Sequence, residues 1–283
     1  MVIIESIRNN EWLQEKFLKR PYSVHALLYL IFIIQGFIYD TPRGIAQGLW
    51  YIIVLPDILI TDYIVVGGIG AAFVNIGLAG LISLVPLAVS KHEPTGLTIG
   101  TLGVVIGMAF FGKNPINMLP IIFGGYLHSV YAKVPFKNCV VPTLLATCLT
   151  PAVTQLAFIE HVPLWFGLIL GMTIGLFIGF IMVPASAHMR KAHEGYNIYN
   201  VGFTAGLLGV MLFALFRHFG VDFYILYIWS EGYNTELTIF LIILSFYFVI
   251  CGVLCKAEEL TVKELVKIDA DDNDYFKRYA EKS

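Results

Sequence analysis

Long apolar runs separated by short polar segments constrain the fold of this chain more than any other feature. Eight runs approach the length needed to cross the roughly 30 Å hydrocarbon core of a bilayer. They cover residues 24–39, 64–89, 95–112, 116–131, 139–159, 163–185, 197–216 and 236–255. Hydrophobic residues make up 58% of the chain and charged residues 13%. We therefore predict an all-α, polytopic transmembrane helix bundle of about eight spans, some of them short enough to be half-helices.

A ninth apolar stretch, residues 46–60, contains a proline and an aspartate near its end, and we interpret it as re-entrant or interfacial. Basic residues accumulate on the cytoplasmic side of membrane proteins, so they test this choice. With 46–60 excluded from the spans, the outer side holds Arg43, Lys113 and Arg217, and the other fifteen basic residues lie inside. We therefore expect a cell-membrane protein with both termini in the cytoplasm.

The distribution of charged residues divides the chain into three segments, and the net charge and the cysteines limit the partners that the protein can bind. Residues 1–20 alternate acids and bases and predict an amphipathic cytoplasmic segment, residues 21–255 form the transmembrane domain, and residues 256–283 form a charged cytoplasmic tail. A formal net charge of −2 excludes nucleic-acid binding, which needs an excess of basic residues. The four cysteines lack paired spacing, which indicates neither a disulfide framework nor a zinc site. The lipid bilayer is the first expected partner, and no cofactor is predicted.

Small residues recur at helix-packing spacing in several runs. They predict close contact between helix backbones rather than a direct role in a pore. The sets are Gly171, Gly175 and Gly179; Gly103 and Gly107; and Gly202 and Gly206.

Two asparagines interrupt otherwise apolar, glycine-rich runs. Asn75 and Asn200 each begin an Asn-x-Gly pattern, and they lie 125 residues apart. A decayed internal repeat and a chance match both remain open. Asn197, Asn200 and Thr204 share one helical face, which can line a cavity or bond a neighbouring helix. An asparagine both donates and accepts hydrogen bonds, so we predict a substrate-binding face for a small, neutral, polar solute.

Residues 112–120 carry a second polar cluster, in which two prolines break helix continuity around Asn114 and Asn117. Broken helices often mark binding sites in carriers, because their freed backbone groups need partners. Lys113 could hold an anionic group, although we favour a snorkelling side chain at a tight outer turn. His128, in the following run, could handle protons or act as a gate, or could be a hydrogen-bonded interior histidine.

A metal site built from His188, His193 and Glu194 is the weakest of the site hypotheses. The two histidines are five residues apart, which does not align them on one helix face. The sequence also lacks the His-Glu-x-x-His arrangement of many zinc enzymes. We interpret this segment as a cytoplasmic loop and predict no metal.

Three separated motifs give the chain a family resemblance. They lie at residues 60–77, 112–120 and 193–206, in that order. Together they resemble the bacterial membrane proteins of domain of unknown function 1576, over most of residues 40–255. The resemblance implies no activity. Members are often longer and carry another block like residues 60–120, so this chain could be a short form, a truncated form, or half of a site completed by a second subunit in a homo-oligomer.

A looser likeness concerns about fifteen residues. Gly195, Tyr196 and Asn197, followed by a small-residue helix, look like the Gly-Tyr-Asn segments of bacterial urea transporters, which are repeat-built channels for a small neutral solute. The proline-rich selectivity motif of that family is not evident here.

Three classes of function follow. We favour a transporter or channel for a small polar solute, and not an enzyme, because of the paired Asn-x-Gly runs and the break at residues 112–120. The alternatives are a subunit of a membrane electron-transfer complex and a membrane-embedded enzyme using His188, His193 and Glu194. A membrane protein with no transport role also remains open.

Overall fold

The computed structural model describes residues 22–56, 61–160, 162–194, 200–221 and 228–254. Within these ranges the fold is all-helical, as predicted. The α-helices are α2 (Ser23–Tyr39), α3 (Pro42–Val54), α4 (Tyr63–Val89), α5 (Gly96–Met108), α6 (Met118–Ala132), α7 (Val140–Ala146), α8 (Thr150–Ala157), α9 (Leu164–Ala192), α10 (Asn200–His218) and α11 (Asn234–Leu254). Two short 3₁₀ helices, η2 (Phe136–Asn138) and η3 (Thr147–Leu149), connect α6, α7 and α8.

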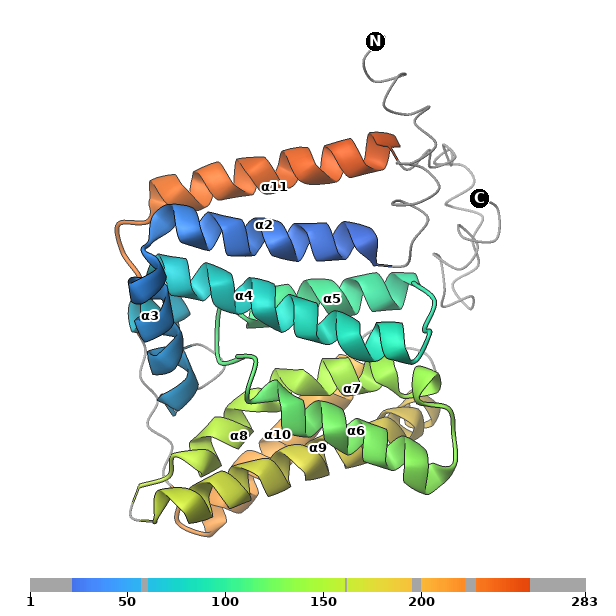
Figure 1. The fold of residues 1–283 in the computed structure, drawn as a ribbon. Helices are drawn as coiled ribbons and strands as arrows, with labels where there is room; N and C mark the ends of the chain where they lie inside the picture. Colours follow the sequence, from blue (N-terminus) through green and yellow to red (C-terminus); the bar gives the residue numbers. More distant parts are fainter. Residues whose placement is uncertain (1–21, 57–60, 161, 195–199, 222–227, 255–283) are drawn as a thin grey trace.

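One half of the bundle consists of α11, α2 and α4, which lie side by side at the top of Figure 1 with α5 next to α4. Helices α2 and α11 are antiparallel. The Tyr39 hydroxyl donates to the Glu236 carbonyl at one end, and the Tyr247 hydroxyl donates to the Val24 carbonyl at the other. Helix α2 packs closely on α4, because the α4 glycine Gly80 faces the ring of Tyr29.

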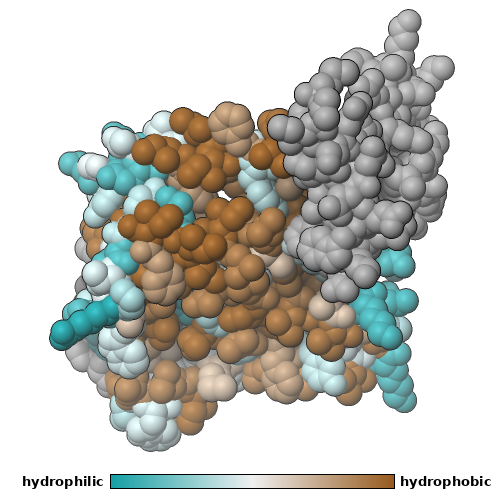
Figure 2. Space-filling model, turned by 45° about the horizontal axis from the view of Figure 1, so that its top comes forward, coloured by the Kyte–Doolittle hydropathy of each residue, from teal (hydrophilic) through white to brown (hydrophobic). Residues whose placement is uncertain are grey.

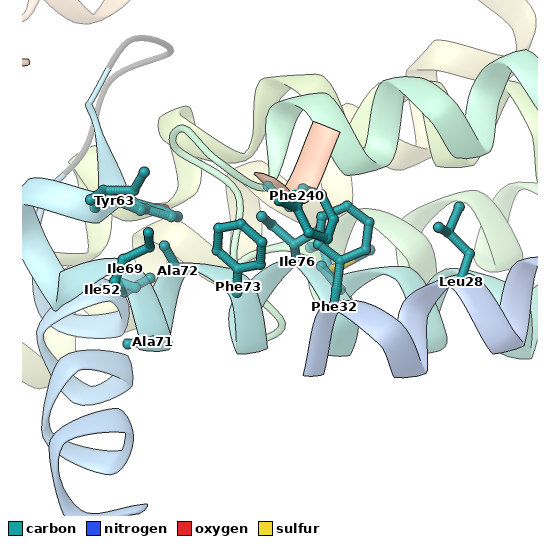
Figure 3. Packing of buried hydrophobic residues seen from close by; sticks show 14 residues of the cluster. Leu28, Phe32, Ile52, Tyr63, Ile69, Ala71, Ala72, Phe73, Ile76 and Phe240 are labelled. Carbon is teal, nitrogen blue, oxygen red and sulfur yellow. The ribbon is translucent and has the colours of Figure 1, made fainter. Parts of the chain in front are cut away.

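Aromatic side chains fill the space between these three helices. The rings of Phe32 on α2 and Phe73 on α4 each lie 4.7 Å from the ring of Phe240 on α11, measured between centroids. Figure 3 shows the three rings converging beside Ile76. This cluster fixes α4, the helix that carries Asn75, against both of its neighbours.

The other half of the bundle consists of α6 to α10, and its packing depends on glycines of α9. A Cβ at Gly179 would collide with the Ile121 carbonyl of α6, and one at Gly171 would collide with the Val153 carbonyl of α8. The packing prediction for the α9 glycines is therefore confirmed. It is not confirmed for Gly103 and Gly107 of α5 or for Gly206 of α10, because a Cβ at each of them would meet no atom of the described chain within 4 Å.

Fewer helices can cross a membrane than the sequence suggested. In the part of the chain that the structure describes, five segments are long and apolar enough: α4, α7 together with α8, α9, α10 and α11. A sixth is reached if α2 and α3 count as one broken span, although they meet at an angle of 115°. The prediction of about eight spans is not confirmed, because α5 and α6 are too short. Their 13 and 15 residues extend about 20 and 22 Å.

Helices α5 and α6 form a hairpin whose two outer ends lie at the same end of the bundle. His92, which follows α4, bonds Thr98 in the first turn of α5 through Nε2 at 2.9 Å. Its Nδ1 bonds the carbonyl of Lys137, just beyond α6, at 3.0 Å. The runs at 95–112 and 116–131 therefore enter and leave at one end, as a re-entrant pair of half-helices does. Because His92 follows Lys91 directly and bonds the carbonyl of Lys137, these two lysines lie at the same end of the bundle.

Helix α3 contains most of the described part of the 46–60 stretch. It runs across the ends of the long helices in Figure 1, and the 115° bend separates it from α2. This geometry agrees with an interfacial or re-entrant segment. Residues 57–60 lie outside the described residues.

The surface is that expected for a membrane protein. Figure 2 shows a broad hydrophobic band across the middle of the molecule, with hydrophilic residues gathered towards its two ends. Large side chains such as Phe246, Ile242 and Val210 are exposed. Lipid tails can cover such a band without cost, whereas water cannot.

Candidate functional site

The candidate site lies where α4 begins and the α5–α6 hairpin turns. Asp62 precedes α4, and its Oδ1 accepts a hydrogen bond from the Ile64 amide at 2.8 Å. Gly68 interrupts α4 with φ of +82°, a conformation that favours glycine because it lacks a Cβ. The segment before this break meets the hairpin, and the Tyr63 amide donates to the Phe110 carbonyl at 3.1 Å. The start of α4 and the loop between α5 and α6 therefore meet inside the bundle.

Residues 109–117, the hairpin loop, are held by the side chains of their own asparagines. Asn114 Oδ1 accepts from the amides of Ile116 and Asn117 at 3.0 and 2.9 Å. Asn117 Oδ1 accepts from the Asn114 amide at 2.9 Å, and its Nδ2 donates to the Gly112 carbonyl at 3.2 Å. Both asparagines are buried. Their main role is to satisfy backbone groups that the helix break leaves free.

A second helix break lies against the hairpin loop and was not predicted from the sequence. Helices α7 and α8 are separated by η3, and the hydroxyl of Thr150 donates to the Gly112 carbonyl at 2.9 Å. Thr147 and Thr150 are both fully buried. The available signal was the run of threonines around Pro151 in an apolar stretch, because proline interrupts a helix.

Asn75 joins the middle of α4 to the hairpin loop. Its Nδ2 donates to the Ala109 carbonyl at 2.8 Å and to the Lys113 carbonyl at 2.9 Å. Because both neighbours are acceptors, the amide must present its nitrogen to them, and its oxygen points away. Asn75 is fully buried, and its Oδ1 has no hydrogen-bond partner among the described residues.

Lys113 lies inside the protein rather than at an outer turn. Its side chain is 1% exposed, and its Nζ is buried without a hydrogen-bond partner in the described chain. The thiol of Cys148, in η3, is close enough to interact electrostatically with it. The snorkelling interpretation and the outer placement of Lys113 are therefore wrong, because the hairpin turns within the bundle and not beyond it.

The face predicted on α10 makes different contacts. Asn200 Oδ1 bonds His193 Nε2 at 2.9 Å, and its Nδ2 donates to the Ser186 carbonyl of α9 at 3.1 Å. The Thr204 hydroxyl donates to the Asn200 carbonyl one turn earlier, at 2.8 Å. Asn200 thus bonds the end of α9 while Asn75 bonds the hairpin loop. Asn197 lies outside the described residues.

Helix α4 and the hairpin loop both lie within a domain that matches a known protein family. Residues 41–218 match the family described as protein of unknown function (DUF1576). The chain belongs to this family. No curated protein and no solved structure matches the chain. The match includes both helix breaks and the start of α10, so the buried polar contacts belong to the family domain.

The remaining predicted residue of this DUF1576 member, His128, lies apart from the hairpin loop. Its ring packs edge-on against Phe180 of α9, with 5.2 Å between centroids. Its Nδ1 is buried without a hydrogen-bond partner in the described ranges. The interpretation as a hydrogen-bonded interior histidine is therefore not supported for Nδ1, and a role in proton handling stays a prediction.

The described part of this DUF1576 domain brings together no group of three histidine, cysteine or acidic residues that could hold a metal ion. Of the metal candidates, His193 bonds Asn200. Cys139, Cys148 and Cys251 are free thiols.

Proposed function

We propose that this protein is a membrane transporter or channel for a small polar solute, and that the solute binds beside the hairpin loop. The observation that carries the proposal is that two of the buried polar atoms without a hydrogen-bond partner in the described chain, Lys113 Nζ and Asn75 Oδ1, belong to residues at the hairpin loop. Such atoms are costly in a membrane interior, and they cluster in proteins where a ligand supplies the missing contact.

The surrounding helices support this proposal. Half-helices and non-helical backbone are tolerated at membrane depth where protein or a water-filled path satisfies them. Helix breaks of this kind form the solute sites of many carriers. Here the turn of the α5–α6 hairpin meets the α7–η3–α8 break, and Thr150 joins the two through the Gly112 carbonyl.

Flux through purified protein tests this function. We would reconstitute the full chain in liposomes and measure entry of a panel of neutral and charged small solutes, with and without proton and sodium gradients. At least one solute should enter faster than in protein-free liposomes, and Asn75→Gln should slow it by displacing the amide. Thr204→Val, on α10, is the matched control and should retain the flux. If no solute in the panel enters faster, the transport proposal fails.

The proposed orientation places both termini in the cytoplasm of a cell-membrane protein. The charge asymmetry supports it, because fifteen of the eighteen basic residues remain on the predicted inner side. A reporter fused after residue 283 should be active inside the cell. Activity confined to the outside would overturn this orientation while leaving the solute site intact.

The other two classes of function also have direct tests. An electron-transfer subunit with a bound flavin would be coloured when purified. An enzyme that uses His188 and His193 would lose its function when both are replaced. A colourless protein and a functional double variant are the outcomes that the transport proposal expects.

A further inference from the structure

The two unpartnered atoms beside the hairpin loop have opposite hydrogen-bonding characters. Lys113 Nζ donates and carries positive charge when protonated, whereas Asn75 Oδ1 accepts. Both atoms are buried, and neither has a hydrogen-bond partner within the described ranges. The Asn75 side chain also bonds the Lys113 carbonyl at 2.9 Å, so the two residues are in direct contact. A solute that satisfies both must combine an acceptor with a donor.

In the described chain, no acidic side chain bonds the Nζ atom of Lys113. Among the described acidic residues, Asp62 pairs its backbone with the hairpin loop, at Phe111. Its two carboxylate oxygens already accept from the Ile64 amide at 2.8 Å and the Ser230 amide at 2.9 Å. A buried ammonium without a counter-charge is strongly unfavourable, so a single negative charge on the solute would stabilise it.

Asn75 needs a donor and would repel an anionic oxygen. Rotating the amide would not help, because its oxygen would then face the carbonyls of Ala109 and Lys113. A plain carboxylate or a halide would therefore satisfy Lys113 and leave Asn75 Oδ1 unpaired. A hydroxyl group on the same molecule would supply the missing donor.

We propose that the solute is a small monovalent hydroxycarboxylate, whose carboxylate pairs with Lys113 Nζ and whose hydroxyl donates to Asn75 Oδ1. This inference rests on the proposed transport function and names the substrate class of the same site. It differs from the neutral solute that the asparagines alone predicted, because Lys113 is buried beside Asn75 instead of exposed at an outer turn.

Transport of matched solutes by the full chain in liposomes tests the charge and the hydroxyl separately. Glycolate and lactate should enter, whereas acetate and propionate, which lack the hydroxyl, should enter at least about tenfold more slowly, because a site built to bond a hydroxyl discriminates strongly against its loss. Glycerol tests the hydroxyl without the charge and should not compete. Lys113→Met should abolish glycolate entry, and Lys137→Met, at an exposed lysine, should retain it.

A binding measurement separates this inference from the transport proposal. Glycolate should raise the melting temperature of the purified wild-type protein and of Lys137→Met, but not that of Lys113→Met. Stabilisation by glycolate without flux would support the site and refute transport. Entry of glycerol or urea in preference to glycolate, or glycolate entry unchanged in Lys113→Met, would overturn the anionic substrate while leaving transport in place.

Discussion

Asn75, which bonds the hairpin loop from α4, and Asn200, in the first turn of α10, are asparagines in different environments. Asn75 is fully buried, holds two carbonyls of the hairpin loop and keeps its Oδ1 unpaired within the described chain. Asn200 is half-buried, and both ends of its amide have partners, His193 and the Ser186 carbonyl. One asparagine therefore retains binding capacity, whereas the other uses its capacity to attach α10 to α9.

This difference shows that a polar side chain in an apolar run is not evidence of a solute site by itself. Thr204 illustrates the point, because its hydroxyl bonds the carbonyl of its own helix at Asn200. The useful criterion is which polar atoms still lack a hydrogen-bond partner once their contacts with the backbone and with neighbouring helices are counted. By this criterion the comparison favours the hairpin loop.

The largest expected effect comes from Asn75→Leu. This change leaves the carbonyls of Ala109 and Lys113 without their side-chain donor, and each buried, unsatisfied group costs about 1–3 kcal/mol. The free energy of unfolding in mixed micelles should fall by about 2–6 kcal/mol, as measured by circular dichroism. Ser83→Ala on the same helix is the matched control, since Ser83 bonds its own helix at the Ala79 carbonyl. Equal effects of the two changes would contradict this role of Asn75.

A smaller loss is expected for Asn114→Ala. Asn114 Oδ1 accepts from the amides of Ile116 and Asn117, both within the hairpin loop. Removing this acceptor should lower the free energy of unfolding by about 1–3 kcal/mol. Asn114→Asp keeps the acceptor and should recover part of that stability. Failure of the aspartate to recover any stability would show that the loop does not depend on this contact.

A weaker effect is expected for Asn200→Leu, because its site is half-buried and water can reach it more easily. The free energy of unfolding should fall by about 1 kcal/mol. A double-mutant cycle with His193→Ala should show coupling of about 0.5–1 kcal/mol, as for two residues that share a hydrogen bond. Additive effects would contradict the contact, and a loss larger than that of Asn75→Leu would reverse the comparison.

The smallest effect is expected for Thr204→Val. The shapes are similar, and the lost hydrogen bond is local to α10. The free energy of unfolding should change by less than about 0.5 kcal/mol, and solute flux should be retained. A flux reduced as strongly as in Asn75→Gln would restore the α10 face as a candidate site.

Parts of the hairpin loop could be predicted from sequence. Two prolines and two asparagines at residues 112–120 indicated a helix break, and the structure places one there. The location of Lys113 could not be predicted, because a run that crosses the membrane and one that turns back inside it have similar composition. The role of Thr150 also depends on a contact with Gly112, 38 residues away.

The glycine patterns also show that sequence spacing cannot predict contacts between helices. The α9 and α5 glycines have similar spacing, yet those of α9 pack against α6 and α8, whereas Gly103 and Gly107 face open space in the described structure. Spacing places residues on one face of a helix, but it does not say which helix, if any, covers that face.

The sequence by itself determined that this is a helical membrane protein with most of its basic residues predicted on one side. Both properties follow from the composition and the order of residues along the chain, so they can be predicted without knowing which distant segments contact each other. The tertiary structure alone decided which polar groups remain unsatisfied. Asn75 reaches carbonyls 34 and 38 residues away, and hydrogen bonding between distant segments depends on how the chain folds back. That folding leaves Lys113 Nζ and Asn75 Oδ1 buried at the hairpin loop without a hydrogen-bond partner in the described chain.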